Sequence, residues 1–60
     1  TALVEALKTE KNSNMQIEII NILVEAQEKK AIPIMRELLE EEEVLPFVKE
    51  QISSGLNQII

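Results

Sequence analysis

The residues best suited to chemistry in this sequence are carboxylates, and the densest group of them is the run Glu40-Glu41-Glu42-Glu43. Carboxylate oxygens are the ligands that Ca²⁺ and Mg²⁺ prefer, so one interpretation is a divalent-cation site. Four consecutive helical residues point in different directions, however, and the chain has no Asp and no Gly nearby to make a tight ligand loop. The sequence therefore favours a solvated, mutually repelling run, with an acidic patch for a partner as the main alternative.

The rest of the composition argues against an enzyme. The 60 residues include no Cys and no His, so thiol and imidazole chemistry are excluded. A pair of carboxylates hydrolyses a glycosidic bond only in a cleft that desolvates one of them, and a chain this short offers no such cleft. We therefore expect a non-catalytic protein that uses no metal and no other cofactor.

Charge and aromatic content narrow the range of partners. Six basic residues face eleven acidic ones, a net charge of −5, which disfavours nucleic acid and anionic membranes as partners. Phe47 is the single aromatic residue, and no apolar run approaches the roughly 20 residues that span a bilayer. The chain starts at Thr1 without Met or a signal-peptide pattern, so we expect a cytoplasmic protein that is an excised or trimmed product.

Any functional side chains must be positioned by helices, because the composition is rich in helix formers and contains one Gly and two Pro. The apolar periodicity predicts one all-α domain over residues 1–60, with helices at about 2–9, 14–29, 31–42 and 46–59. Their connections are short, which makes consecutive helices antiparallel neighbours.

Local signals support these boundaries. Thr1 is a candidate N-cap for the first helix, and Ser13 with Gln16 predicts a capping box for the second. Lys29 and Lys30 suit the C-terminal end of that second helix. Pro33 and Pro46 belong in the first turns of the last two helices, where a missing N–H has no intrahelical partner.

The helix at 14–29 is predicted to be the centre of the structure because it carries two apolar stripes. The first stripe comprises Met15, Ile19, Ile22, Leu23 and Ala26, and the second comprises Ile17, Ile20 and Val24. A helix that is apolar on two sides packs between neighbours on both. We expect the helix at 2–9 to cover part of the second stripe.

The helix at 46–59 has one apolar stripe, which reproduces the first stripe of the 14–29 helix 33 residues later: Val48, Ile52, Gly55, Leu56 and Ile59. The helices at 2–9 and 31–42 overlay in the same way at an offset of 31. These offsets predict an internal repeat of two helices. The second stripe is replaced by Glu50, Ser53 and Asn57, which predicts that the last helix is a C-terminal cap with a polar outer face.

The sequence AIPIMRELL at 31–39, followed by VKEQISSGLNQI at 48–59, resembles the HEAT-like repeats of phycobilisome-lyase-type proteins. Their helices follow the patterns A-I-P-x-L-x-x-L-L and V-R-x-x-A-x-x-A-L-x-x-I. Ile52 and Gly55 stand where that family usually has Ala, and Glu43 stands where Asp is common. Residues 14–59 cover nearly two such units. The resemblance implies a right-handed α-solenoid with a scaffold role, and it carries over no catalytic residue.

In such solenoids the second helix of each repeat lines a concave face. The resemblance places the following partner-binding residues there: Glu5, Thr9, Arg36, Glu37, Glu40 and Glu43. Because this face is mostly acidic, we expect a basic peptide or protein as its ligand. An accessory role for a chromophore lyase is a further possibility, although the chain has no Cys, His, Tyr or Trp to hold a tetrapyrrole.

Self-association is the alternative function. The helix at 2–9 is too short to cover both ends of its neighbour, which predicts an open apolar surface made of Leu3, Val4, Ile17, Ile20 and Phe47. Exposed apolar surface of this kind marks an interface. The occupant would be a second copy of the chain or upstream repeats, for which residues 1–60 would form the C-terminal end.

Overall fold

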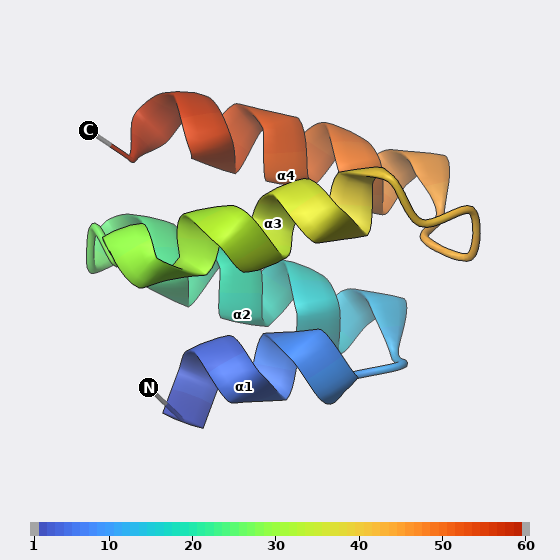
Figure 1. Cartoon of the computed structure of the whole chain (residues 1–60), viewed down its shortest axis with the longest axis horizontal. Helices are drawn as coiled ribbons and strands as arrows, with labels where there is room; N and C mark the ends of the chain where they lie inside the picture. The colour runs from blue at the N-terminus through green and yellow to red at the C-terminus, as the bar shows by residue number, and fades with distance from the viewer. Residues whose placement is uncertain (1, 60) are drawn as a thin grey trace.

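The computed structural model describes residues 2–59, and these residues form an all-helical structure (Figure 1). Its elements are α1 (Ala2–Thr9), α2 (Ser13–Glu25), the 3₁₀ turn η1 (Lys29–Ala31), α3 (Ile32–Leu39) and α4 (Pro46–Gln58). No strand occurs within this part of the chain. The predicted all-α class and the four helices are therefore confirmed, while the proposed cap Thr1 lies outside the described residues.

The start of α2 differs from the predicted capping box by one residue. Asn12, not Ser13, is the N-cap, and its Oδ1 accepts a hydrogen bond of 3.1 Å from the amide of Met15. The Gln16 side chain does not return to the helix start. It is buried, and its Nε2 donates at 2.9 Å to the carbonyl of Glu10, just beyond α1. Gln16 thus satisfies a carbonyl that the end of α1 leaves open.

The end of α2 also comes earlier than expected, at Glu25, because the backbone turns at Gln27 with φ 54°. The amides of Gln27 and Glu28 donate to the carbonyls of Val24 and Leu23, both at 3.0 Å, which is the Schellman arrangement. A left-handed residue other than Gly is costly. The Gln27 side chain offsets that cost, since its Nε2 donates to Val24 O at 3.2 Å and to Gln58 O at 2.9 Å.

The acidic run lies outside α3, which ends at Leu39 and not at residue 42. Glu40 is the C-cap, the amide of Glu41 donates to Leu38 O at 3.2 Å, and the amide of Val44 donates to Glu41 O at 3.3 Å. Carboxylates are unfavourable beside the open carbonyls at a helix C-terminus, which gives a physical reason for the helix to stop before the run. Glu41, Glu42 and Glu43 are consequently exposed in a turn.

The helices form two layers, α1 beside α3 and α2 beside α4, with the core between them (Figure 1). The core comprises Val4, Leu7, Ile19, Ile20, Leu23, Ala31, Met35, Leu38, Val48, Ile52 and Ile59. The α2 and α4 helices run in the same direction. Hydrogen bonds join Asn21 to Gln51 and Gln27 to Gln58, so contacts advance along both helices together.

Gly55 is a point of close contact between α4 and α2. A Cβ atom on Gly55 would lie 2.9 Å from Val24 Cγ2 and 3.4 Å from Ile20 Cγ2. The second stripe of α2 therefore meets α4 at Val24 and Ile20. Helix α1 also packs against α2, and its expected cover of part of this stripe stays a prediction. Small residues allow helices to approach closely, and the missing side chain at Gly55 lets α4 pack tightly against α2.

The contrast in polarity between α2 and α4 is confirmed for the second stripe. Ile20 is 1% exposed and Val24 is partly buried, whereas the equivalent Ser53 and Asn57 are exposed. The first stripe of α2 is buried at two of its five members, Ile19 and Leu23, whereas the other three, Met15, Ile22 and Ala26, are exposed.

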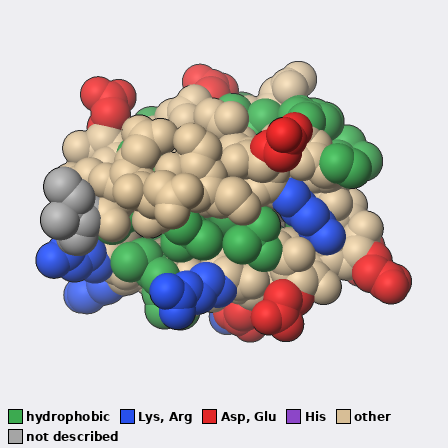
Figure 2. All heavy atoms as spheres, turned by 90° about the horizontal axis from the view of Figure 1, so that it is seen from above, with side chains coloured by type: hydrophobic (Ala, Val, Ile, Leu, Met, Phe, Trp, Pro, Cys, Tyr) green, Lys and Arg blue, Asp and Glu red, His purple; other side chains and the backbone are tan. Residues whose placement is uncertain are grey.

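Figure 2 looks down on α4, and its middle is mostly polar side chains and backbone. Hydrophobic side chains are visible at one end of this face. The exposed Leu45 and Phe47 flank Pro46, where α4 begins. Within residues 2–59, no helix is long and apolar enough to cross a bilayer.

Candidate functional site: a groove between two turns

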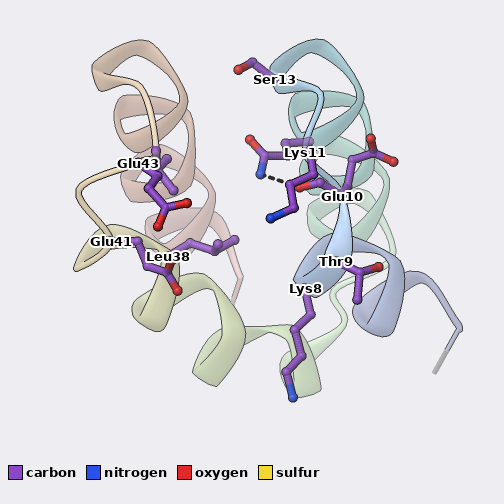
Figure 3. A pocket seen from close by; sticks show the side chains of 10 residues that line it. Lys8, Thr9, Glu10, Lys11, Ser13, Leu38, Glu41 and Glu43 are labelled. Carbon is purple, nitrogen blue, oxygen red and sulfur yellow. Dashed lines mark hydrogen bonds between the residues drawn. The ribbon is translucent and has the colours of Figure 1, made fainter.

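An open groove of about 470 Å³ lies at the end of the molecule where α1 leads into α2 and α3 leads into α4 (Figure 3). It is lined by Lys8, Thr9, Glu10, Lys11, Ser13, Gln16, Leu38, Glu41, Glu43 and Val44. A smaller hollow of about 60 Å³ adjoins it between α1 and α3, where Lys8 and Leu38 meet Ile34, Glu37 and Glu41. The two hollows share residues and form one continuous surface.

The two walls of the groove differ in charge. Lys8 and Lys11 come from the α1 side, together with Glu10, and Glu41 and Glu43 come from the α3–α4 turn. Figure 3 shows the side chains of Lys11 and Glu43 pointing toward one another from opposite walls. Charges that face a groove pair with a ligand's charges of the opposite sign, so this surface can hold a segment with ionic groups on both edges.

The α1 wall of the groove is held by hydrogen bonds within its own turn. Glu10 Oε2 accepts from the amide of Asn12 at 3.1 Å, and the Glu10 carbonyl accepts from Gln16. The Thr9 hydroxyl donates back to carbonyls of its own helix, at 3.3 Å to Glu5 and 3.4 Å to Ala6. These bonds fix the backbone and leave the Lys8 and Lys11 side chains exposed for a ligand.

The predicted concave-face residues are only partly brought together. Thr9 and Glu43 line the groove and Glu37 lines the adjoining hollow, whereas the remaining three, Glu5, Arg36 and Glu40, are exposed but line neither. The prediction of a mostly acidic concave face stays a prediction, and the groove itself carries both Lys8 and Lys11 and the carboxylates Glu41 and Glu43.

The predicted apolar association surface is also broken up. Val4 is 7% exposed and Ile20 is 1% exposed, since both pack in the core, and Ile17 is partly buried. Leu3 and Phe47 are exposed, at 38% and 47%. They belong to the first turns of α1 and α4, which lie at opposite corners of the molecule (Figure 1). These five residues therefore do not form one patch.

Sequence reasoning missed Lys8 and Lys11 as groove residues, and it considered Glu41 only as part of the acidic run at 40–43. A signal for two of these positions was present, because the internal repeat pairs residues about 32 positions apart and so brings the turn after α1 beside the turn after α3. At that spacing Lys11 matches Glu43 and Thr9 matches Glu41. A repeat places equivalent turns at the same end, and opposite charges at matching positions then face each other.

Comparisons of the chain with protein-family models, with curated proteins and with solved structures gave no match. In the part of the chain that the structure describes, no group of three or more carboxylates is placed to hold a metal ion. The groove offers ammonium groups, carboxylates, hydroxyls and one amide. These groups bind by charge and hydrogen bonding.

Proposed function

We propose that this protein is a non-catalytic module that binds a segment of another protein. In this proposal it comprises about two HEAT-like units of a right-handed α-solenoid, with consecutive helices antiparallel and α4 as the C-terminal cap. Support comes from the parallel contacts of α2 and α4, about 30 residues apart, and from the exposed polar residues on the outside of α4. A repeat array ends in such a polar face. The cytoplasmic location stays a prediction.

The groove carries the functional part of the proposal. It has a volume of about 470 Å³, and one of its walls receives two carboxylates from an exposed turn. The net charge of −5 adds a long-range attraction for cationic ligands. The ligand is therefore a basic segment whose Lys or Arg side chains reach Glu41 and Glu43 while a carboxylate or backbone carbonyl faces Lys11.

The acidic wall is tested with a double variant, Glu41→Gln with Glu43→Gln. Its control, Glu42→Gln with Glu50→Gln, removes the same two charges from exposed positions that do not line the groove. The probe is a fluorescein-labelled peptide of alternating Lys and Ala, followed by fluorescence anisotropy. Exposed ion pairs contribute about 0.2–1 kcal/mol each, so we expect the first variant to weaken binding by about 2- to 30-fold. The control should stay within about twofold, because it changes only the screened long-range field.

Salt provides an independent measure of the same contact. The Debye length falls from ~10 Å at ~0.1 M salt to ~3 Å at ~1 M, so binding of the Lys-Ala peptide should weaken strongly over this range. Equal losses in the two double variants would show that net charge alone attracts the peptide. Such a result, or binding that does not respond to salt, would contradict the groove assignment.

A further inference from the structure

A second surface lies on α2, on the side away from α4. Met15 and Ile22 are 44% and 47% exposed, and Ala26 continues the same stripe at helical spacing. At about 100° per residue, Val24 falls on the opposite side of the helix, where it meets Gly55. We call the exposed stripe, Met15, Ile22 and Ala26, the free flank. Exposed apolar residues gathered on one helix face mark an interaction site.

The internal repeat shows what kind of element the free flank fits. At the offset of 33 residues, Met15, Ile22 and Ala26 correspond to Val48, Gly55 and Ile59, and all three of these are buried. Gly55 is the residue through which α4 approaches Val24 and Ile20 of α2. The positions through which α4 packs against α2 thus correspond, in the repeat, to positions that α2 leaves exposed. An α-helix running parallel to α2 therefore matches the free flank.

A polar contact at the edge of the same face specifies the chemistry of that helix. In the α2–α4 pair, Gln51 Nε2 donates to Asn21 Oδ1 at 3.3 Å. The residue that corresponds to Gln51 in α2 is Glu18, which is exposed. An ionised carboxylate accepts hydrogen bonds and does not donate them. The helix on the free flank must consequently present a donor where α2 presents Asn21, and a Lys or Arg there would complement the charge.

A second copy of the chain does not supply such a helix. The outward positions of α4 are Glu50, Ser53 and Asn57, which are polar and exposed. If α4 of one copy stacked on the free flank of another, α4 would therefore contribute no apolar side to the contact. Pairing the free flanks of two copies would bring Glu18 and Glu25 of both chains together, in chains that each carry a net charge of −5. Like charges at an interface are repulsive.

We propose that the free flank binds an amphipathic helix with an apolar pair at positions i and i+4 and a Lys or Arg at i+1, opposite Glu18. In α2 these positions are Ile20, Val24 and Asn21. This assignment does not depend on the groove, because the two surfaces have no residue in common. The partner is defined by its helical face and its positive charge.

Two peptides derived from α2 test the proposal. Both contain residues 12–27, one with Asn21→Lys and the other with Asn21→Glu, and each is titrated into isotope-labelled protein followed by NMR chemical shifts. We expect the Asn21→Lys peptide to bind about threefold more tightly, the effect of one exposed ion pair. The shifts should move at Met15, Ile22 and Ala26, while the groove residues Glu41 and Glu43 should stay unchanged.

Two protein variants make the test specific. Ile22→Asp should weaken binding at least about tenfold, because a carboxylate then lies in the apolar contact. The control Phe47→Asp changes an equally exposed apolar residue, 47% in both cases, and should have no effect. Glu18→Lys should reverse the preference, so that the Asn21→Glu peptide binds more tightly. Circular dichroism checks that each variant keeps its helical content.

Three results would overturn the proposal. One is equal binding of the two peptides to the natural protein. Another is a shift pattern centred on the groove or on Phe47. The third is a dimer of the protein alone that sedimentation detects and that Ile22→Asp abolishes, since the flank would then belong to a second copy.

Discussion

Replacing Ile20 with Ala should lower the free energy of unfolding by ~2–5 kcal/mol, the usual cost of removing a buried Ile side chain. Ile20 is 1% exposed and lies between α2 and the Gly55 segment of α4. The total stability of a 60-residue domain is about 0.05–0.15 kcal/mol per residue, or ~3–9 kcal/mol, so this variant should lose a large part of it. Urea denaturation followed by circular dichroism measures the loss.

The control for this prediction is Ile22→Ala, two residues further along the same helix. The Ile22 side chain is 47% exposed, so its truncation should change the unfolding free energy by less than ~0.5 kcal/mol. The two variants delete the same atoms and differ only in where the side chain lies. Similar losses in both would mean that the free flank is covered in solution, and a loss only in Ile22→Ala would reverse the assigned faces of α2.

Replacing Gly55 with Val should lower the free energy of unfolding by about 1–3 kcal/mol, although most residues favour a helix more than Gly does. The added Cβ would lie 2.9 Å from Val24 Cγ2 and 3.0 Å from Met35 Cε. Met35 can move its flexible end, but the branched Val24 side chain has little freedom in a helix. In the Gly55→Val variant α2 and α4 must therefore move apart, and thermal denaturation should show a lower Tm than for the natural sequence.

A nearby exposed position gives the comparison for Gly55. Ser53→Ala lies on the polar outer side of α4 and should raise the free energy of unfolding by a few tenths of a kcal/mol, about the difference in helix propensity. If Gly55 were exposed, Gly55→Ala would also raise the free energy of unfolding, by about 1 kcal/mol, because Ala favours a helix more than Gly does. If Gly55→Ala did stabilise the protein by that amount, the close contact between α2 and α4 would be absent.

Sequence periodicity was sufficient where a helix has one buried side. In α4, Pro46 marks the first turn and the single stripe identifies the buried residues, from Val48 to Ile59. In α2 the periodicity identified two apolar sides and predicted a neighbour on each, but Met15 and Ile22 of the first stripe are exposed. Met15 and Ile22 have the same character as Ile19 and Leu23, and only the placement of α4 against Val24 separates the exposed residues from the buried ones.

The errors at helix ends have local causes. Asn12 and Ser13 are both good N-caps, so a one-residue choice between them depends on geometry that their residue types do not specify. The positive φ of Gln27 could not be predicted from its residue type, because that conformation is held by hydrogen bonds to Val24 and to the distant Gln58. The groove was difficult to predict for the same reason. Lys11 and Glu43 face each other only because the turn after α1 lies beside the turn after α3.

The central claim is that one side of α2, with Ile20 and Val24, packs against α4, while the opposite side, the free flank, is exposed to solvent. It is tested most directly by ¹³C-edited nuclear Overhauser spectra of the methyl groups of α2. The structure predicts cross-peaks from the Val24 and Ile20 methyl groups to the α protons of Gly55, and none from Ile22. Cross-peaks from Ile22 to Gly55, or the absence of any contact between Val24 and Gly55, would contradict the arrangement.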